Sequence, residues 1–576
     1  MICLHHPTER RKQFKTVAKI RARIHRILKK TIRDSPLELI DTSTGELHGR
    51  DKRESMFKSS PIYEHLISSM TTCFSRSRIK RVIREYFQYV VLSHKWDDNE
   101  PLFQEVVKIA VYRLGDSLTY NKLQTYCKVS RDAGFHWAWS DTCCIDKSDK
   151  FVLQESLVAM FRWYQGSALM IVFLRGVGSS SPPGALAGSI WNTRAWTLQE
   201  YIAAKNIRFY TEDWTLYRDL PLSNHKESPE VISEMEQATK VSAQQLRSLR
   251  PGLSNIREKL RLASNRDTTR VEDAAYSLLG IFSAAGISAI YGEGEVSLAR
   301  LLSNILTRSG DVSILAWTGE SSQFNSCLPA HITVFSSPAT SHLPAPISDA
   351  DMQRIIADTQ FDRDMALQLY DRLDGLPAPK FSESRMTLPC IASYLLPSSS
   401  HWQQHRTRLG RTYHVDTVMF GRVEIRTRQD LSQMTSLYLV HPWLDTLLQG
   451  EDTDHLDAPS PPPDTEDEDF SDDDSDEEFD KEFSNEDTHS SSPVNMLRPT
   501  LRNSSKRAPM VREIDAQRLF ARLRQPFGAL LFKKTSSGGR VADYRRVAAD
   551  SLIRVRFQNN VSLTDILSRV RTIAVL

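Results

Sequence analysis

The 576-residue sequence lacks several signatures that would place it in a class at once. Its seven cysteines are scattered and none shows CxxC spacing, so neither a disulfide framework nor a zinc site is expected. The N-terminal MICLHHPTERRKQ has no apolar core of a signal peptide. No apolar run approaches the ~18 residues needed to cross a bilayer. We therefore predict a protein of the reducing cytoplasm.

Nucleotide-binding and hydrolase motifs are also missing. The sequence has no P-loop and no GxSxG nucleophile elbow. The YGEG of residues 291–294 lacks the third glycine and the preceding strand of a dinucleotide-binding loop, so we interpret it as a turn. Neither a resident cofactor nor a metal ion is predicted.

Charge is nearly balanced over the whole chain, at a formal +3, but it is strongly segregated. Residues 10–33 are basic, and their apolar side chains recur at helical spacing, which predicts an amphipathic helix within residues 1–35. That helix could cover the body of the protein, dock on a partner or touch an anionic membrane surface; we favour the first. It carries no DNA-binding motif, so nucleic acid is not an expected partner.

The opposite charge gathers in residues 451–508, which are acidic, rich in serine and proline and poor in core formers. Such a composition predicts a disordered linker. Short strand signals precede it in residues 311–450 and follow it in residues 509–576, so we expect both to build one β-rich C-terminal domain. The acidic linker could also contact the basic helix, a contact that high salt would weaken.

Short apolar runs alternate with helical patterns between residues 89 and 215. The runs are YVVLSH, HWAW, ALMIVFL and NIRFY, and the segments between them repeat apolar side chains on one helical face. This alternation predicts an α/β core with a parallel sheet flanked by helices. Residues 36–88 lead into the core, and residues 216–310 are predicted to be mainly helical.

Polar side chains follow two of the predicted strands, where ligands of a parallel sheet bind. Ser93 and His94 end the first strand, and Asp141 follows the second. Each also has an ordinary structural explanation, because strand ends and turns need polar side chains for their backbone groups. A predicted helix near residue 200 adds one carboxylate, and the orientation of that helix decides whether it reaches the same edge. The candidate site residues are Ser93, His94, Trp96, Asp141, Arg194, Trp196 and Glu200.

Three blocks of this region resemble the signature blocks of the fungal heterokaryon incompatibility (HET) domain. They are YVVLSHKWDDNEP, WAWSDTCCIDKSDKFVLQESLVAMFRWYQGSALMIVFL and NTRAWTLQEYIAAKNIRFY, in the family's order. The similarity covers roughly residues 36–320. Many family members carry glycine directly after the tryptophan of the first block, where this chain has Asp97, so the loop there can differ in shape.

The resemblance implies a TIR-like fold and a role in fungal self/non-self recognition and cell-death signalling, through self-association or protein partners. Some TIR domains cleave NAD at the nicotinamide–ribose bond with one glutamate, and Glu200, four residues after Trp196, occupies the corresponding place. Two hypotheses stay open. One is a signalling module without catalysis. The other is an NAD glycohydrolase in which Glu200 is the key carboxylate and NAD is a substrate rather than a cofactor.

Overall fold

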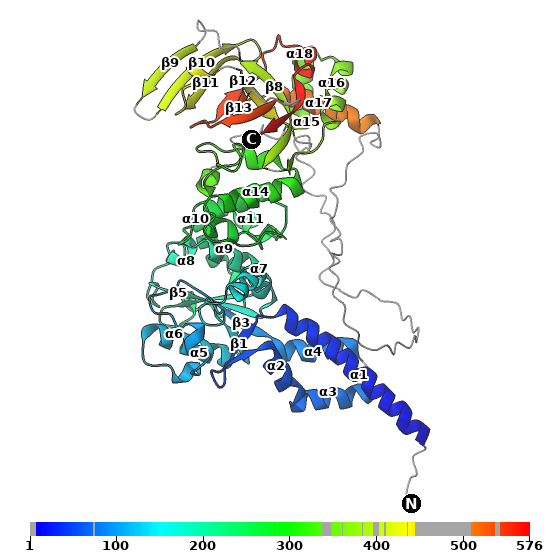
Figure 1. Cartoon of the computed structure of the whole chain (residues 1–576), viewed down its shortest axis with the longest axis vertical. Coiled ribbons are helices and arrows are strands. Elements are labelled where there is room, and N and C mark those ends of the chain that lie inside the picture. Colours follow the sequence, from blue (N-terminus) through cyan, green and yellow to red (C-terminus); the bar gives the residue numbers. More distant parts are fainter. Residues whose placement is uncertain are drawn as a thin grey trace, which may run out of the picture. The chain divides into compact units, whose positions relative to one another are not determined.

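The chain forms two compact units, which we describe separately. Unit 1 consists of Met1–Thr307 and Ser313–Ala339, and unit 2 of Arg308–Val312 and Thr340–Leu576. Both contain helices and sheets, so the predicted α/β class is confirmed (Figure 1). The computed structural model describes residues 7–72, 75–284, 286–336, 347–359, 361–382, 384–395, 402–407, 410–434, 436–443, 509–535 and 542–576.

Unit 1 begins with a small helical bundle, whose members are α1 (Pro7–Asp34), α2 (Arg50–Lys58), α3 (Pro61–Thr72) and α4 (Arg76–Phe87). One face of α1, including Ile24 and Leu28, is fully buried against Phe57 of α2 and Ile83 of α4. The basic helix thus packs its apolar face within the chain, the arrangement that we favoured. In the described part of the chain, no helix is long and apolar enough to cross a membrane.

The sheet of unit 1 has six strands in the order β2-β1-β4-β3-β5-β6. Its four predicted strands pair in parallel, and they are β3 (Tyr89–His94), β4 (Trp137–Trp139), β5 (Leu169–Leu174) and β6 (Ile207–Thr211). The hairpin of β1 (Glu38–Asp41) and β2 (Leu47–Gly49) extends the sheet antiparallel beyond β4. This hairpin lies inside the predicted lead-in segment, residues 36–88.

The strand β3 lies at the turning point of this sheet. It is the first parallel strand in sequence, yet β4 pairs with it on one side and β5 on the other. Connections from β3 and β4 therefore leave in opposite directions, and the carboxyl end of such a strand is where open α/β sheets usually bind their ligands. Ser93 and His94 stand at that end. The helices between the parallel strands are α5 (Phe103–Val106), α6 (Leu118–Asp132), α7 (Lys150–Gly166), α8 (Ile190–Thr193) and α9 (Trp196–Ala203).

The helix predicted near residue 200 is α9, and a break at Arg194 separates it from the short helix α8 before it. The cause lies far along the chain, because the backbone oxygen of Asp267 accepts a hydrogen bond from Ala195 N–H at 3.0 Å and Arg194 bridges to Asp267. The second piece, α9, packs against β3. The break thus sets the direction in which α9 runs past the end of β3.

The segment after β6 is largely helical, as expected, and packs onto the sheet region. Gly280 lies directly against the Phe161 side chain of α7, where a Cβ atom would overlap the ring. The helices of this segment are α10 (Pro229–Thr239), α11 (Ala243–Ser248), α12 (Ile256–Ser264), α13 (Asp273–Tyr276) and α14 (Val296–Ser309).

The variant Gly280→Ala should lower the free energy of unfolding by about 1–3 kcal/mol, because the added methyl group overpacks the contact with Phe161. Urea unfolding of the full chain measures this change. Gly115→Ala is the matched control, since an added Cβ there meets no atom of the described chain within 4 Å. Equal effects of the two substitutions would contradict the packing argument.

The YGEG turn is occupied by a carboxylate of the chain itself. Glu272 Oε1 accepts hydrogen bonds from Gly292 N–H at 2.7 Å and Gly294 N–H at 3.1 Å. Both glycines have positive φ angles, 101° and 61°, which side-chain-bearing residues rarely adopt. The backbone groups that could have cradled a phosphate therefore hold Glu272, in keeping with the interpretation as a turn.

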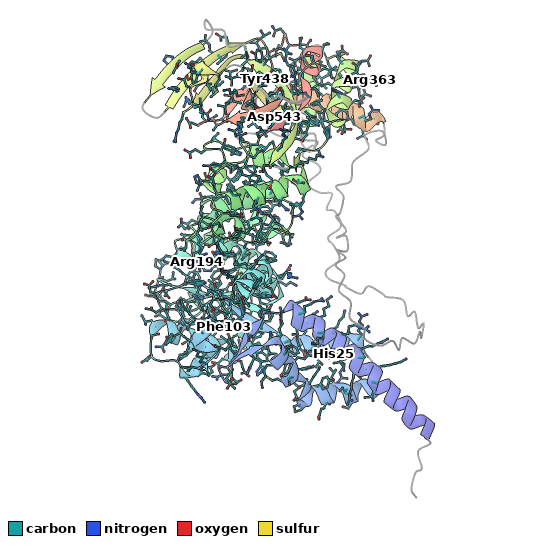
Figure 2. The ribbon with its side chains drawn as sticks, viewed as in Figure 1. His25, Phe103, Arg194, Arg363, Tyr438 and Asp543 are labelled. Carbon is teal, nitrogen blue, oxygen red and sulfur yellow. The ribbon has the colours of Figure 1, made fainter. Side chains whose placement is uncertain are left out.

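Unit 2 is built around a seven-stranded sheet that joins strands from both sides of the acidic stretch. β12 (Leu437–Pro442), before it, pairs with β13 (Phe527–Thr535), after it. Figure 2 labels Tyr438 and Asp543 on this sheet. The acidic residues 451–508 themselves lie outside the described residues. The other strands of the sheet are β7 (Lys380–Ser382), β8 (Arg385–Leu395), β14 (Asp543–Val547), β15 (Ile553–Val555) and β16 (Val570–Val575).

The C-terminal region expected to be β-rich differs from that prediction in two places. Residues 509–576 open with the helix α17 (Pro509–Leu523), and the start of the segment expected to be β-rich from residue 311 forms the 3-10 helix η4 (Val312–Leu315). Residues 313–339 group with unit 1 rather than with the β-rich domain expected from residue 311. The remaining elements are α15 (Asp349–Asp358), α16 (Arg363–Asp374), α18 (Leu563–Leu567), β9 (Trp402–Thr407), β10 (Gly410–Thr417) and β11 (Gly421–Thr427).

Candidate functional site

Glu200 lies in a buried polar chain at the carboxyl end of β3. Only 4% of the surface of Glu200 is exposed to solvent. The Ser93 hydroxyl donates a hydrogen bond to the Glu200 carboxylate, and the Trp191 indole N–H donates to Ser93 Oγ at 2.7 Å. The first and third sequence blocks therefore meet through Ser93 and Glu200. Ser93 is the central member, because it accepts from the indole and donates to the carboxylate.

Burial dominates the electrostatics of Glu200. Removal of water raises the pKa of its carboxyl group to about 7, although the charge of Arg194 and hydrogen bonds from Ser93 and Tyr164 favour ionisation. The charge of Asp141 adds to the upward shift. A carboxyl group with this pKa changes its protonation state near neutral pH, which suits either a buried structural acid or an acid–base group.

The α8–α9 junction is held by a residue that sequence analysis missed. Arg266 Nη1 donates to the backbone oxygen of Arg194 at 2.9 Å and to Thr197 Oγ1 at 2.8 Å. Burial lowers the pKa of Arg266 to about 10, while the charge of Glu200 acts against that shift. Arg194 in turn donates to the backbone oxygen of His94. No local pattern in the sequence marks Arg266, because its role arises from a contact far along the chain.

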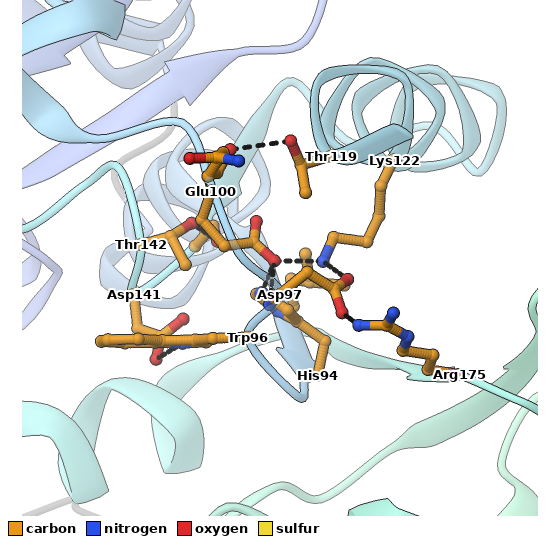
Figure 3. Close-up of polar contacts among 12 residues, drawn as sticks. His94, Trp96, Asp97, Glu100, Thr119, Lys122, Asp141, Thr142 and Arg175 are labelled. Carbon is orange, nitrogen blue, oxygen red and sulfur yellow. Dashed lines mark hydrogen bonds and ion pairs between the residues drawn. The ribbon is translucent and has the colours of Figure 1, made fainter. Parts of the chain in front are cut away.

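His94 points away from Glu200 into a separate charge cluster, shown in Figure 3. Successive side chains of a strand point to opposite faces, so Ser93 and His94 cannot both face α9. His94 Nε2 lies 3.6 Å from Glu100 Oε1. Lys122 Nζ of α6 pairs with Glu100 and lies 3.0 Å from Asp97 Oδ2. The structure thus separates two neighbouring residues that the sequence had grouped in one site.

Asp97, the residue that replaces the family's usual glycine, ties this cluster to the next loop. One oxygen of its carboxylate pairs with Lys122, and the other pairs with Arg175 directly after β5 (Figure 3). The Asp97 N–H also donates to Glu100 Oε1 at 2.9 Å. The loops after β3 and β5 are therefore joined by charged contacts, which a glycine at this position could not make.

The pKa shifts of the cluster follow from burial and pairing. Burial lowers the pKa of His94 and of Lys122, because both lose water in the charged form. Burial opposes ionisation of Glu100 as well, but His94 and Lys122 together hold its pKa below the ordinary value. The arrangement is that of a paired, buried ionic network.

Trp96 and Asp141 meet at the surface of the same sheet edge. The Trp96 residue is 41% exposed, and its indole N–H donates to Asp141 Oδ2 at 2.8 Å. Lys147 Nζ lies 4.0 Å from the centroid of the Trp96 ring, a cation–π geometry. These two predicted residues therefore join the loops after β3 and β4, while Trp96 keeps part of its ring open to solvent.

Trp196, a candidate site residue, contacts the segment after β6 and not Ser93 or Glu200. Its indole group bonds to Asp273 of α13, and the Tyr291 hydroxyl donates to Asp273 Oδ1 at 2.9 Å. Burial raises the pKa of Asp273 despite these hydrogen bonds. A largely buried indole N–H needs an acceptor, and α13 supplies it. Trp196 thus links the sheet region to the segment after β6 rather than joining Ser93 and Glu200.

Comparison with known proteins identifies one family and one relative. Residues 89–187 match the family described as Heterokaryon incompatibility protein (HET). The chain is 34% identical over 229 residues to "Vegetative incompatibility protein HET-E-1" of Podospora anserina. That alignment covers 38% of this chain and only 16% of the relative. No solved structure matches the chain significantly.

Proposed function

We propose that this chain, which carries a HET domain over residues 89–187, acts in fungal self/non-self recognition as a TIR-like signalling module. It would trigger incompatibility and cell death through self-association or protein partners. The 34% identity to a relative named as a vegetative incompatibility protein carries this proposal. The order β4-β3-β5-β6 of parallel strands is in keeping with a TIR-like core.

The burial of Glu200 favours the hypothesis of a signalling module over that of an enzyme. The residue is 4% exposed, and its carboxylate already accepts a hydrogen bond from Ser93, which in turn accepts one from Trp191. A substrate must reach a catalytic carboxylate, whereas a structural acid needs no access. A signalling module requires only that the domain fold and present its surface to partners.

Induced expression of the full chain in a fungal host tests this function. We expect growth arrest or cell death with the wild-type chain, and killing within about twofold of that level with Glu200→Gln. The overpacked variant Gly280→Ala serves as the folding-impaired comparison, since its effect on the domain is steric. Absence of any growth defect would contradict the proposed function. Loss of killing in a well-folded Glu200→Gln would contradict the hypothesis of a signalling module without catalysis.

A second candidate function is favoured by the position and pKa of Glu200. In NAD the nicotinamide is a cationic leaving group, so its bond to ribose C1′ can break without a general acid. The electron pair leaves with nicotinamide, water adds to C1′ and loses a proton, and ADP-ribose forms. An ionised carboxylate would stabilise the oxocarbenium charge that develops at C1′. Glu200, oriented by Ser93, is the group that could act in this way once the site opened.

Nicotinamide release measures this candidate activity directly. Because the pKa of Glu200 is about 7 and its ionised form is required, the rate should rise about tenfold between pH 6 and pH 8. Glu200→Gln should abolish the release, while Glu85→Gln, on the surface of α4, should leave it unchanged. A wild-type chain that releases no nicotinamide when assembled with its partners would eliminate this candidate.

A further inference from the structure

A pocket of about 300 Å³ opens between α3 and α4, in the helical bundle at the start of unit 1. Its lining is mainly apolar. It includes Leu66, which is buried, and Ile62, which is 46% exposed. Concave apolar sites with a few polar groups are the usual form of a binding pocket. The lining residues are Pro61, Ile62, His65, Leu66, Ser69, Arg78 and Val82.

The helix α4, which forms one side of this pocket, and its neighbour α1 are rich in basic residues. α4 contains five lysines and arginines and one acidic residue, Glu85, while its apolar face holds Ile79 and Ile83 in the core. α1 packs against α4, and from Val17 to Asp34 it carries seven lysines and arginines and one acidic residue. Some of these cations pair within the bundle, as Lys29 does with Glu54 and Arg81 with Glu85. The two helices nevertheless hold twelve lysines and arginines against two acidic residues in these ranges. A partner for the surface should therefore be acidic and should bring an apolar side chain to the pocket.

We propose that residues 464–487 of this chain dock on the basic surface and place a phenylalanine in the α3–α4 pocket. These 24 residues contain fifteen aspartates and glutamates and one lysine. Within that acidic run stand Phe470, Phe479 and Phe483, the only apolar side chains of the segment. The segment thus combines the two properties that the surface requires, negative charge and an aromatic anchor. This inference is independent of the proposed signalling or NAD-cleaving function.

The charges would guide the segment to the surface, and the phenylalanine would fix its position. Attraction between exposed opposite charges is long-ranged but screened by salt, so the contact should weaken as ionic strength rises. The aromatic ring adds a contribution that salt does not screen, because it removes apolar area from water. Arg78 lies where both effects meet, since it lines the pocket and belongs to the basic helix.

Hydrogen exchange of the full-length protein tests the proposal, with amides of residues 62–69 and 78–82 as the reporters. A tethered segment at millimolar effective concentration and with an affinity near 0.1 mM should slow exchange there about tenfold. Replacing Phe470, Phe479 and Phe483 by serine should remove that protection, as should high salt. Replacing Ser471, Ser475 and Ser484 by alanine is the matched control and should leave it intact.

A second variant separates docking from changes in the helices themselves. Ile62→Ser removes an exposed apolar group at the pocket, and in that background the phenylalanine substitutions should have no further effect. Equal exchange in the wild-type chain and the phenylalanine variant would overturn the proposal. Protection that disappears on dilution would overturn it too, because the occupant would then come from a second copy of the chain.

Discussion

The substitution Glu200→Gln should change the free energy of unfolding more favourably at pH 8 than at pH 4.5, by about 3 kcal/mol. The folded protein raises the pKa of this carboxyl group from 4.5 to about 7, and each unit corresponds to about 1.4 kcal/mol. With a raised pKa, the favourable contribution of Glu200 is complete below the unfolded value near 4.5 and is lost as pH rises through about 7. Glutamine does not titrate, so the variant avoids this loss.

Urea unfolding of both proteins at several pH values between 4.5 and 8 measures the effect. The difference in free energy of unfolding between variant and wild type matters, because other titrating groups contribute equally to both and cancel. Glu85→Gln is the control, since Glu85 lies on the surface beside Arg81 and is 64% exposed at its side chain. A Glu200→Gln difference that stays constant across this range would show that the carboxyl group is not desolvated in the folded state.

The sequence was informative wherever local pattern determines structure. Four apolar runs of strand length predicted β3, β4, β5 and β6, because strands buried on both faces need continuous apolar side chains. The rule for ligand positions in parallel sheets selected Ser93, which does meet Glu200. The hairpin of β1 and β2 was missed, because its strands ELID and LHG contain no continuous apolar run like those of the four predicted strands.

Long-range contacts limited the prediction of the site. His94 follows Ser93 in sequence, but strand alternation sends it to the opposite face, toward α6. Trp196 belongs to the same block as Glu200, yet its indole group is taken by Asp273. Arg266 had no recognisable motif, although it supports the corner from which α9 starts. Each of these assignments depends on which segments the fold brings together, and local composition does not encode that.

Lys122→Met should destabilise the protein by about 3–5 kcal/mol, the cost of removing one partner from a buried ion pair. The Lys122 side chain is 5% exposed and pairs with Glu100, whose side chain is 6% exposed, and with Asp97. Methionine fills a similar volume, so the loss reports the unpaired carboxylates rather than a cavity. Urea unfolding at neutral pH measures it, and Arg81→Met is the control. Arg81 and Glu85 form an exposed pair at 3.9 Å, worth at most about 1 kcal/mol.

The double variant Lys122→Met, Glu100→Gln distinguishes unpaired charge from lost packing. Removing the Glu100 charge together with the Lys122 charge should recover a substantial part of the loss, because no cation is then needed beside that oxygen. Recovery should be partial, since Asp97 keeps its charge and retains Arg175 as a partner. A single variant that loses less than about 1 kcal/mol would mean that water reaches the cluster and that the loops after β3 and β5 open freely. A full loss would mean instead that water stays out of this network and that its carboxylates depend on Lys122 for pairing.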